Sequence, residues 1–129
     1  MADWTKKQLP ETHDSAPDFG FGEFGEAHFA GKELDATETG VAYHVLKPGK
    51  RQAFGHRHDN AEEVHVILSG SGRVKLDDEV VDVAPLDALR LAPHVKRQFE
   101  AGPDGLSYVV FGPHHDKDGE LDKEFWTDA

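Results

Sequence analysis

The chain of 129 residues contains no cysteine, and this absence excludes disulfide bonds, thiolate metal ligands and cysteine nucleophiles. It also lacks an apolar run of the roughly 20 residues that a membrane-spanning helix requires. No apolar stretch of the kind found in secretory signal peptides lies near the N-terminus. These absences predict a cytoplasmic protein that does not interact with membranes.

Basic residues are the second shortage. Lysine and arginine number 14 against 25 aspartate and glutamate residues, and the formal net charge is −11 at pH 7. Binding to nucleic acid requires a basic surface that neutralises phosphates, so we expect no nucleic-acid partner. The simplest role of the negative charge is to keep the protein soluble.

Short apolar segments separated by glycine, proline and aspartate dominate the middle of the chain. We expect strands over residues 41–46, 52–58, 63–68, 73–76, 79–83, 88–91, 98–100 and 106–111, with turns at 70–72 and 102–105. Strands of this length and spacing are typical of an all-β sandwich or barrel. The chain length suits one domain with a single core.

Two flanking segments differ from this pattern. Residues 1–36 are interpreted as an N-terminal arm in which Phe19, Phe21 and Phe24 pack on the barrel or on a partner subunit. Within the arm, residues 26–34 form either a strand or a short turn of helix. Residues 113–129 are interpreted as a polar C-terminal tail that ends in a short helix near residues 121–126.

The highest density of ligand-type side chains lies between Gly55 and Gly70. In an extended strand, His56 and His58 project from the same face. Residues 59–61 favour a turn, after which Glu63 opens the next strand and faces the two histidines. Two imidazoles and one carboxylate with open positions opposite form the ligand set of non-heme Fe(II) oxygenases, and the same set also binds Zn.

This stretch resembles the first motif of the cupin superfamily, which reads His-x-His, four residues, Glu, six residues, Gly. The resemblance extends from about Val41 to Gly112. It implies a double-stranded β-helix, or jelly-roll barrel, over residues 37–112. It also implies a divalent metal, with Fe, Mn, Ni and Zn as candidates, bound by His56, His58 and Glu63.

The second cupin motif is matched in rhythm but not in residues. Arg97 falls where a metal-binding cupin has its last histidine, and Ala101 replaces the asparagine. A guanidinium stays protonated and is not a metal ligand. If Arg97 faces inward, it pairs with Glu63, opposes a cation and suits an anionic ligand. The alternative is that Arg97 faces the solvent.

Other side chains have weaker claims to the site. His65 follows Glu63 by two residues on the same face, so it is either an acid–base group in the cavity or a histidine at the edge of the core. Of Tyr43 and His44, one must face inward, and we expect Tyr43 to line the cavity. His94 is interpreted as a surface histidine rather than a further ligand. Residues 114–120 are interpreted as a solvated turn.

Three functions remain open. The first is a small-molecule cupin that binds an anionic metabolite through a divalent metal, with Arg97, His65 and Tyr43 around the ligand. The second is a metal-free module that binds or senses a small acid. The third is a metal-free acid–base isomerase or epimerase. Because small cupins commonly pair and the arm is rich in phenylalanine, we also expect a homodimer. Whether the protein is an enzyme stays open.

Overall fold

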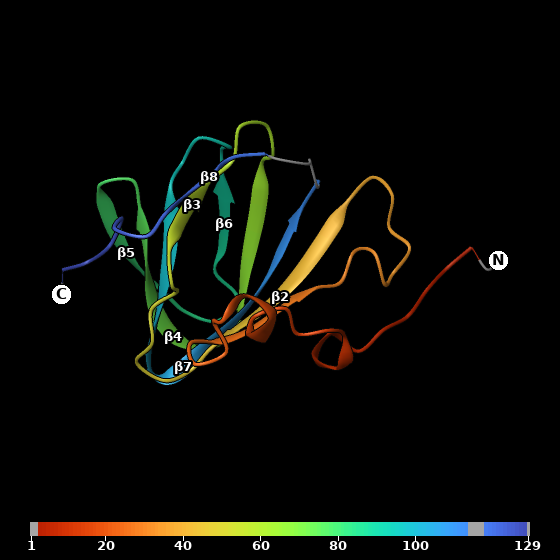
Figure 1. The fold of residues 1–129 in the computed structure, drawn as a ribbon, viewed down its shortest axis with the longest axis horizontal. Helices are drawn as coiled ribbons and strands as arrows, with labels where there is room; N and C mark the ends of the chain where they lie inside the picture. Colours follow the sequence, from red (N-terminus) through yellow and green to blue (C-terminus); the bar gives the residue numbers. More distant parts are fainter. Residues whose placement is uncertain (1–2, 114–117, 129) are drawn as a thin grey trace.

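The structure, a computed structural model, describes residues 3–113 and 118–128 and is built almost entirely from β-strands (Figure 1). The described residues form the strands β1 (Gly25–Phe29), β2 (Gly40–Leu46), β3 (Gly55–Arg57), β4 (Glu63–Leu76), β5 (Glu79–Val83), β6 (Ala88–Leu91), β7 (Arg97–Gly112) and β8 (Glu120–Asp122). Two short 3-10 turns, η1 (Leu9–Glu11) and η2 (Pro17–Phe19), precede β1. Among these residues no helix has the length and apolar character needed to span a membrane.

All strands belong to one antiparallel sheet that curls on itself. The sheet follows the order β1-β2-β7-β3-β8, and β4 pairs with β5, β6 and β7. The long strands β4 and β7 pair along most of their length, so they connect the two halves of the curled sheet. The all-β jelly-roll barrel expected from the sequence is confirmed.

The turns expected at residues 70–72 and 102–105 are wrong, because β4 and β7 continue through them. The β4–β7 pairing shifts register between Ile67 and Ser69 and again between Gly70 and Gly72. Gly70 has φ +85°, and a Cβ there would lie 2.0 Å from the carbonyl oxygen of Gly105. These glycines therefore allow two bent strands to approach closely, rather than reversing the chain.

The C-terminal helix expected near residues 121–126 is also wrong. Residues 121–122 belong to β8, which pairs with Gly55, His56 and Arg57 of β3, and residues 123–126 form a turn and a bend. β3 lies between two strands. One edge pairs with β7 at His56↔Arg97, and the other edge pairs with β8. Beyond β8, Trp126 is buried, and the guanidinium of Arg51 lies 4.1 Å from its ring centroid. The tail is thus attached to the barrel.

The N-terminal segment packs on its own barrel and contributes a strand to it. β1 lies within the expected arm and pairs with β2 along its whole length, so the strand alternative for residues 26–34 is correct over Gly25–Phe29. The ring of Phe21 contacts Phe54 at a centroid distance of 5.5 Å, whereas Phe19 is exposed. From Thr12 onward the arm is therefore part of the described fold, whereas residues 3–8 are exposed and extend away from the sheet (Figure 1).

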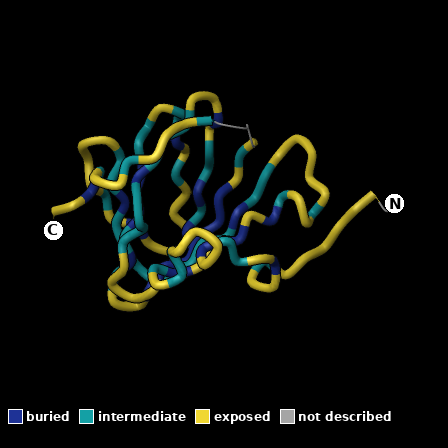
Figure 2. Tube along the Cα trace, viewed as in Figure 1, coloured by how far each residue is buried: buried dark blue, intermediate teal, exposed yellow. Residues whose placement is uncertain are grey.

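The core lies between the two halves of the sheet, where the buried residues in Figure 2 are concentrated. Ile67, Val74, Phe99 and Tyr108 are each no more than 1% exposed. Phe99 and Tyr108 stack at 4.3 Å. Burial of an apolar side chain of this size contributes about 2 kcal/mol each. The core fills one part of the barrel and leaves polar residues at the other.

Candidate ligand site in the barrel

Two histidines and a glutamate converge at the polar end of the barrel. His56 lies in β3 and His58 follows two residues later, so both side chains project from one face. Glu63 is the first residue of β4. One potential ligand atom from each residue lies within 4.8 Å of the other two. The cluster expected from the sequence therefore exists in the fold.

His58 is oriented from two sides. Its Nδ1 donates to the backbone oxygen of Asp118 at 3.0 Å, which leaves Nε2 to face the cluster. This Nε2 is buried, lies 3.4 Å from Oε2 of Glu63, and has no aligned hydrogen-bond partner among the described residues. Contact with Glu63 raises the pKa of His58. A positive charge, either a proton or a metal ion, is therefore favoured between these two side chains.

Arg97 faces the interior and is fully buried, so the solvent-facing alternative is wrong. It pairs with His56 in the β3–β7 register, which puts both side chains on one face of the sheet. Its Nη1 donates to Oε1 of Glu63 at 3.0 Å, and its Nη2 donates to the backbone oxygen of Ala92 at 3.1 Å. The Nε group has no partner among the described residues. Arg97 thus lies against the cluster, at the position where the second cupin motif has its metal-binding histidine.

The charges of the cluster follow from these contacts. Burial opposes ionisation of Glu63, but contacts with His58, His65 and Arg97 outweigh it and lower the Glu63 pKa to about 2. Burial and the nearby Arg97 lower the pKa of His56 to about 4. At neutral pH His56 is therefore neutral and Glu63 ionised, which are the forms that bind metal ions.

His65 lies beside the cluster, at the edge of the core. Its Nε2 is 3.8 Å from Oε1 of Glu63, and its ring stacks on Phe99 at 5.3 Å. The side chain is buried, and Nδ1 has no hydrogen-bond partner in the described part of the chain. Burial lowers the His65 pKa to about 3. His65 is therefore a neutral imidazole that borders the site.

The expectation that Tyr43 lines the cavity is wrong, because His44 takes the inward position. Ala42 and Leu46 flank His44 on the same face of β2, and both belong to the core. The His44 ring stacks on Tyr108 at 5.1 Å, and burial lowers its pKa to about 4. Tyr43 lies on the opposite face of the strand.

Two further residues border the site that the sequence pattern did not indicate. The hydroxyl of Tyr108 accepts a hydrogen bond from Nε2 of Gln52 at 2.9 Å, and burial raises the pKa of this hydroxyl. Gln52 also binds the backbone of β7, since its Oε1 accepts from the N–H of Phe99 at 2.8 Å. The sequence points to Tyr108 only through the alternation along β7, in which Tyr108 lies on the same face of the strand as the core residues.

Asp118 organises the turn between β3 and β4. Its carboxylate accepts hydrogen bonds from the backbone N–H groups of Asp59, Asn60 and Ala61 at 2.7–3.0 Å. Burial opposes ionisation, but these bonds outweigh it and lower the pKa of Asp118. The interpretation of residues 114–120 as a solvated turn is therefore wrong at Asp118, while residues 114–117 lie outside the described residues.

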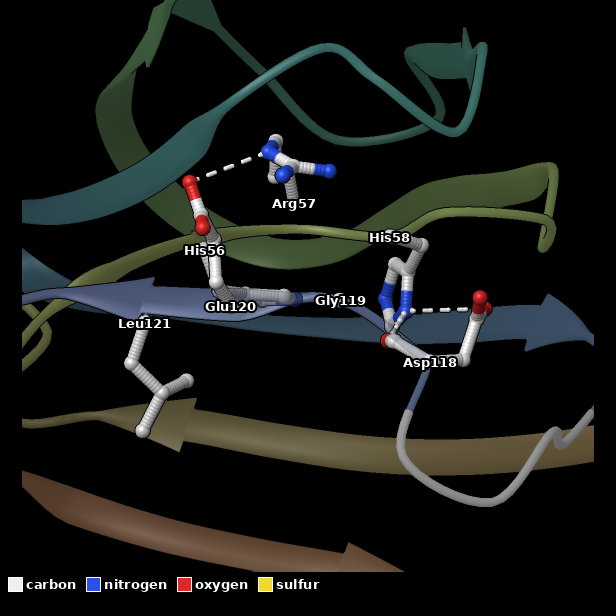
Figure 3. A pocket seen from close by; sticks show the side chains of 7 residues that line it. All are labelled: His56, Arg57, His58, Asp118, Gly119, Glu120 and Leu121. Atoms are coloured by element: carbon white, nitrogen blue, oxygen red, sulfur yellow. Dashed lines mark hydrogen bonds and ion pairs between the residues drawn. The ribbon is translucent and has the colours of Figure 1, made fainter.

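A pocket of about 250 Å³ adjoins the cluster. It is lined by His56, Arg57, His58, Asp118, Gly119, Glu120 and Leu121. In Figure 3, Leu121 and His58 point to one side of the β3–β8 pair, while Glu120 and Arg57 meet on the other side. The pocket thus gives the side chains of β3 and β8 access to solvent.

A single histidine and one further group of ligand-type residues lie away from the barrel site. His94 is exposed, in agreement with its interpretation as a surface histidine. Asp14, Glu26 and His28 also lie within 4.8 Å of one another, outside the barrel. His28 Nδ1 donates to the backbone oxygen of Thr12 at 2.8 Å, and Asp14 accepts from the N–H of Ala27 at 3.0 Å. This second group attaches the N-terminal segment to β1.

The donor set at the barrel site fits a divalent ion. His56, His58 and Glu63 supply two imidazoles and one carboxylate. The buried Nε2 of His58, which has no hydrogen-bond partner in the part of the chain that the structure describes, points to where such an ion would bind. Arg97 competes for Glu63 and adds a positive charge. The residues therefore suit an ion with three protein ligands and positions left for other donors.

Similar folds occur among solved structures. A cupin protein from Bacteroides fragilis has a TM-score of 0.70 and 24% identity, over 91% of this chain and 89% of that chain. The polyketide cyclase RemF from Streptomyces resistomycificus has a TM-score of 0.73 and 15% identity, over 96% and 87%. A variant of the Bacillus subtilis oxalate decarboxylase has a TM-score of 0.71 and 20% identity, over 88% of this chain but 31% of that chain.

No curated protein matches the sequence closely enough to suggest an activity. The sequence profile of the cupin domain matches residues 42–111, which is more than half of the chain and includes β2 to β7 apart from the first two residues of β2 and the last residue of β7. The profile match agrees with the jelly-roll topology and with the histidine–glutamate cluster at its mouth. The chain belongs to the cupin family.

Proposed function

We propose that this barrel binds a small anionic molecule through a divalent cation held by His56, His58 and Glu63. The observation that carries the proposal is the buried Nε2 of His58. It faces the ionised carboxylate of Glu63 at 3.4 Å, and within residues 3–113 and 118–128 it has no aligned hydrogen bond. A cation between the two groups would satisfy both.

The charge of the pocket selects the ligand. A divalent ion, the carboxylate of Glu63 and the guanidinium of Arg97 sum to a net charge of about +2 inside an acidic protein. An anion with an oxygen donor complements this charge. The named substrate of one structural relative, oxalate, is a small dianion, and this agrees with the proposed ligand class.

A second candidate is a metal-free module that binds a small acid directly. The ion pair between Arg97 and Glu63, at 3.0 Å, favours it, because the pair neutralises the cluster without a cation. In this case Arg97 and the neutral imidazoles would supply the anion contacts. Acid–base catalysis by His65 is less favoured, because a pKa of about 3 lies far below the range suited to proton transfer at neutral pH.

The metal content of the purified protein distinguishes the two candidates. Protein prepared without added metal is analysed by elemental methods, then melted with and without Mn(II), Fe(II), Ni(II) and Zn(II). We expect at least one ion to raise the melting temperature of the wild type. Glu63→Gln should reduce this increase, whereas His94→Ala should retain it because His94 is an exposed histidine outside the cluster.

The opposite result would refute the metal site. If no ion is present and none raises the melting temperature, the barrel does not hold a divalent cation under these conditions. Oxalate or acetate that still stabilises the metal-free protein would then support direct binding by Arg97.

A further inference from the structure

We infer that the ligand of this site carries an apolar group beside its anionic group. This inference rests on the proposed function, since it names the class of anion that the barrel binds. It follows from apolar side chains that lie on the inner face of the strands around the cluster and are still exposed. The ligand class is a carboxylate with a short alkyl or aryl group.

β8 provides the first of these side chains. Leu121 pairs with His56 in the β3–β8 register, so both side chains lie on the same face. Arg57 and Glu120 form an ion pair at 3.1 Å on the other face. Leu121 is 63% exposed and lines the same pocket as His56 and His58 (Figure 3). It is therefore available to contact a ligand next to the cluster.

β1 provides the second, from the opposite end of the strand order. Phe29 pairs with Ala42, which belongs to the core, so Phe29 also lies on the inner face. Its ring contacts the inward-facing His44 at 5.6 Å, and Phe29 is 58% exposed. The two end strands of the path β1-β2-β7-β3-β8 thus each present one large, solvent-accessible apolar side chain to the interior.

Phe54 extends the apolar border next to β3. It precedes His56 by two residues, and the two rings meet edge to face at 6.2 Å. Phe21 of the N-terminal segment covers Phe54 at 5.5 Å. Phe54 therefore places an apolar ring directly beside His56, and Phe21 packs behind it.

Single exposed apolar residues are common on protein surfaces, so exposure alone would mean little. What distinguishes Leu121 is the alternation of its strand. The outward residues of β8, Glu120 and Asp122, are charged and pair with Arg57 and Lys96, while the inward residue is a leucine that no core covers. This pattern is typical of a strand whose inner face meets an apolar group.

The size of the pocket guides the choice of probe. The pocket has a volume of about 250 Å³ and is open to solvent. A carboxylate with a chain of about six carbons fits beside the cluster. Hexanoate is therefore a suitable probe, and acetate is its short counterpart with the same charged group.

The test is a calorimetric titration of the full chain with acetate, butanoate, hexanoate and oxalate, with saturating Ni(II) and again without metal. Each methylene that becomes buried should tighten binding by about three- to fourfold. We expect hexanoate to bind at least tenfold more tightly than acetate. Leu121→Asn and Phe29→Ser should each weaken hexanoate binding several-fold and leave acetate binding unchanged.

The control is Leu86→Asn, which replaces another exposed leucine. Leu86 lies in the turn between β5 and β6 with φ +73°, a conformation that asparagine tolerates. This variant should bind the whole series as the wild type does. Melting curves of all variants establish that each is folded.

Three results would overturn the inference in different ways. Equal affinity for acetate and hexanoate would refute the apolar subsite and leave the proposed anion site intact. A wild-type preference for hexanoate that survives both Leu121→Asn and Phe29→Ser would refute the assignment of these two residues. Failure of all four anions to bind, with and without Ni(II), would refute the proposed function itself.

Discussion

Replacing Arg97 by histidine should convert the barrel site into a stronger metal site. The substitution Arg97→His removes a fixed positive charge and supplies an imidazole at the position where the second cupin motif has a histidine. In the wild type, Arg97 is fully buried, and its Nη1 lies 3.0 Å from Oε1 of Glu63. An ion bound by Glu63 would therefore lie close to the guanidinium.

The magnitude can be worked from this geometry. A divalent ion and a guanidinium about 5 Å apart repel each other by about 7 kcal/mol at an effective dielectric constant of about 20. Glu63 and entering water offset much of this repulsion. We therefore expect Arg97→His to raise the affinity for Ni(II) or Zn(II) by at least tenfold, or about 1.4 kcal/mol. The metal-free variant should be less stable than the wild type, because Glu63 loses its buried partner.

Calorimetric titration with Ni(II) and Zn(II) measures the effect, and Arg97→Met provides the matched control. Methionine removes the charge but supplies no imidazole ligand, so its affinity should fall between wild type and Arg97→His. In the absence of metal, binding of acetate or oxalate should weaken in both variants, because the guanidinium donors are gone. Equal metal affinities in all three proteins would show that no cation binds beside Arg97, and the reasoning would be refuted.

Four other predictions concern the buried histidines, the turn next to His58, the C-terminal tail and the oligomeric state. The melting temperature should fall as the pH is lowered below about 6.5, because His65 has a folded pKa of about 3 and His44 and His56 of about 4 against 6.5 ordinarily, so the unfolded chain takes up these protons first and each histidine lowers stability by up to about 1.4 kcal/mol per pH unit; a flat profile would contradict the burial of three neutral imidazoles. Asp118→Ala should lower Ni(II) affinity by about tenfold, because it removes the carboxylate that holds the backbone N–H groups of residues 59–61 and so loosens the turn next to His58, and calorimetry would show no change if the turn were unimportant. Trp126→Ala should destabilise the fold by about 3 kcal/mol in urea denaturation, and a loss below about 1 kcal/mol would mean that the tail is dispensable. We also expect a homodimer, so deletion of residues 1–25, which include Phe19, Phe21 and Phe24, should lower the oligomeric state found by light scattering, and an unchanged monomer in both forms would contradict this expectation.

The local arrangement of the site could be predicted because it depends on short-range geometry. His56 and His58 alternate along one strand, and Glu63 follows His58 after a four-residue connection with turn residues, so few arrangements of the chain separate them. The all-β class followed from the spacing of apolar segments. The alternative that Arg97 faces inward came from the residue spacing of the second cupin motif, in which Arg97 takes the position of the last histidine.

The errors arose where one pattern has two physical solutions. Alternation requires that either Tyr43 or His44 faces inward, but only the packing of β2 on Tyr108 decides in favour of His44. The glycines within residues 70–72 and 102–105 suit a turn and also suit a bent pair of strands. No single-strand pattern distinguishes these alternatives.

Sequence alone determined the strand-rich class of the chain, the His56–His58–Glu63 cluster and the absence of thiolate chemistry, because composition and alternation act within a few residues. Only the tertiary structure decided that Arg97 pairs with Glu63 and that Asp118 orients His58. These contacts join residues 34 and 60 positions apart in the sequence. Their geometry depends on the register of β3 against β7 and β8, which is set when distant strands pack around one core.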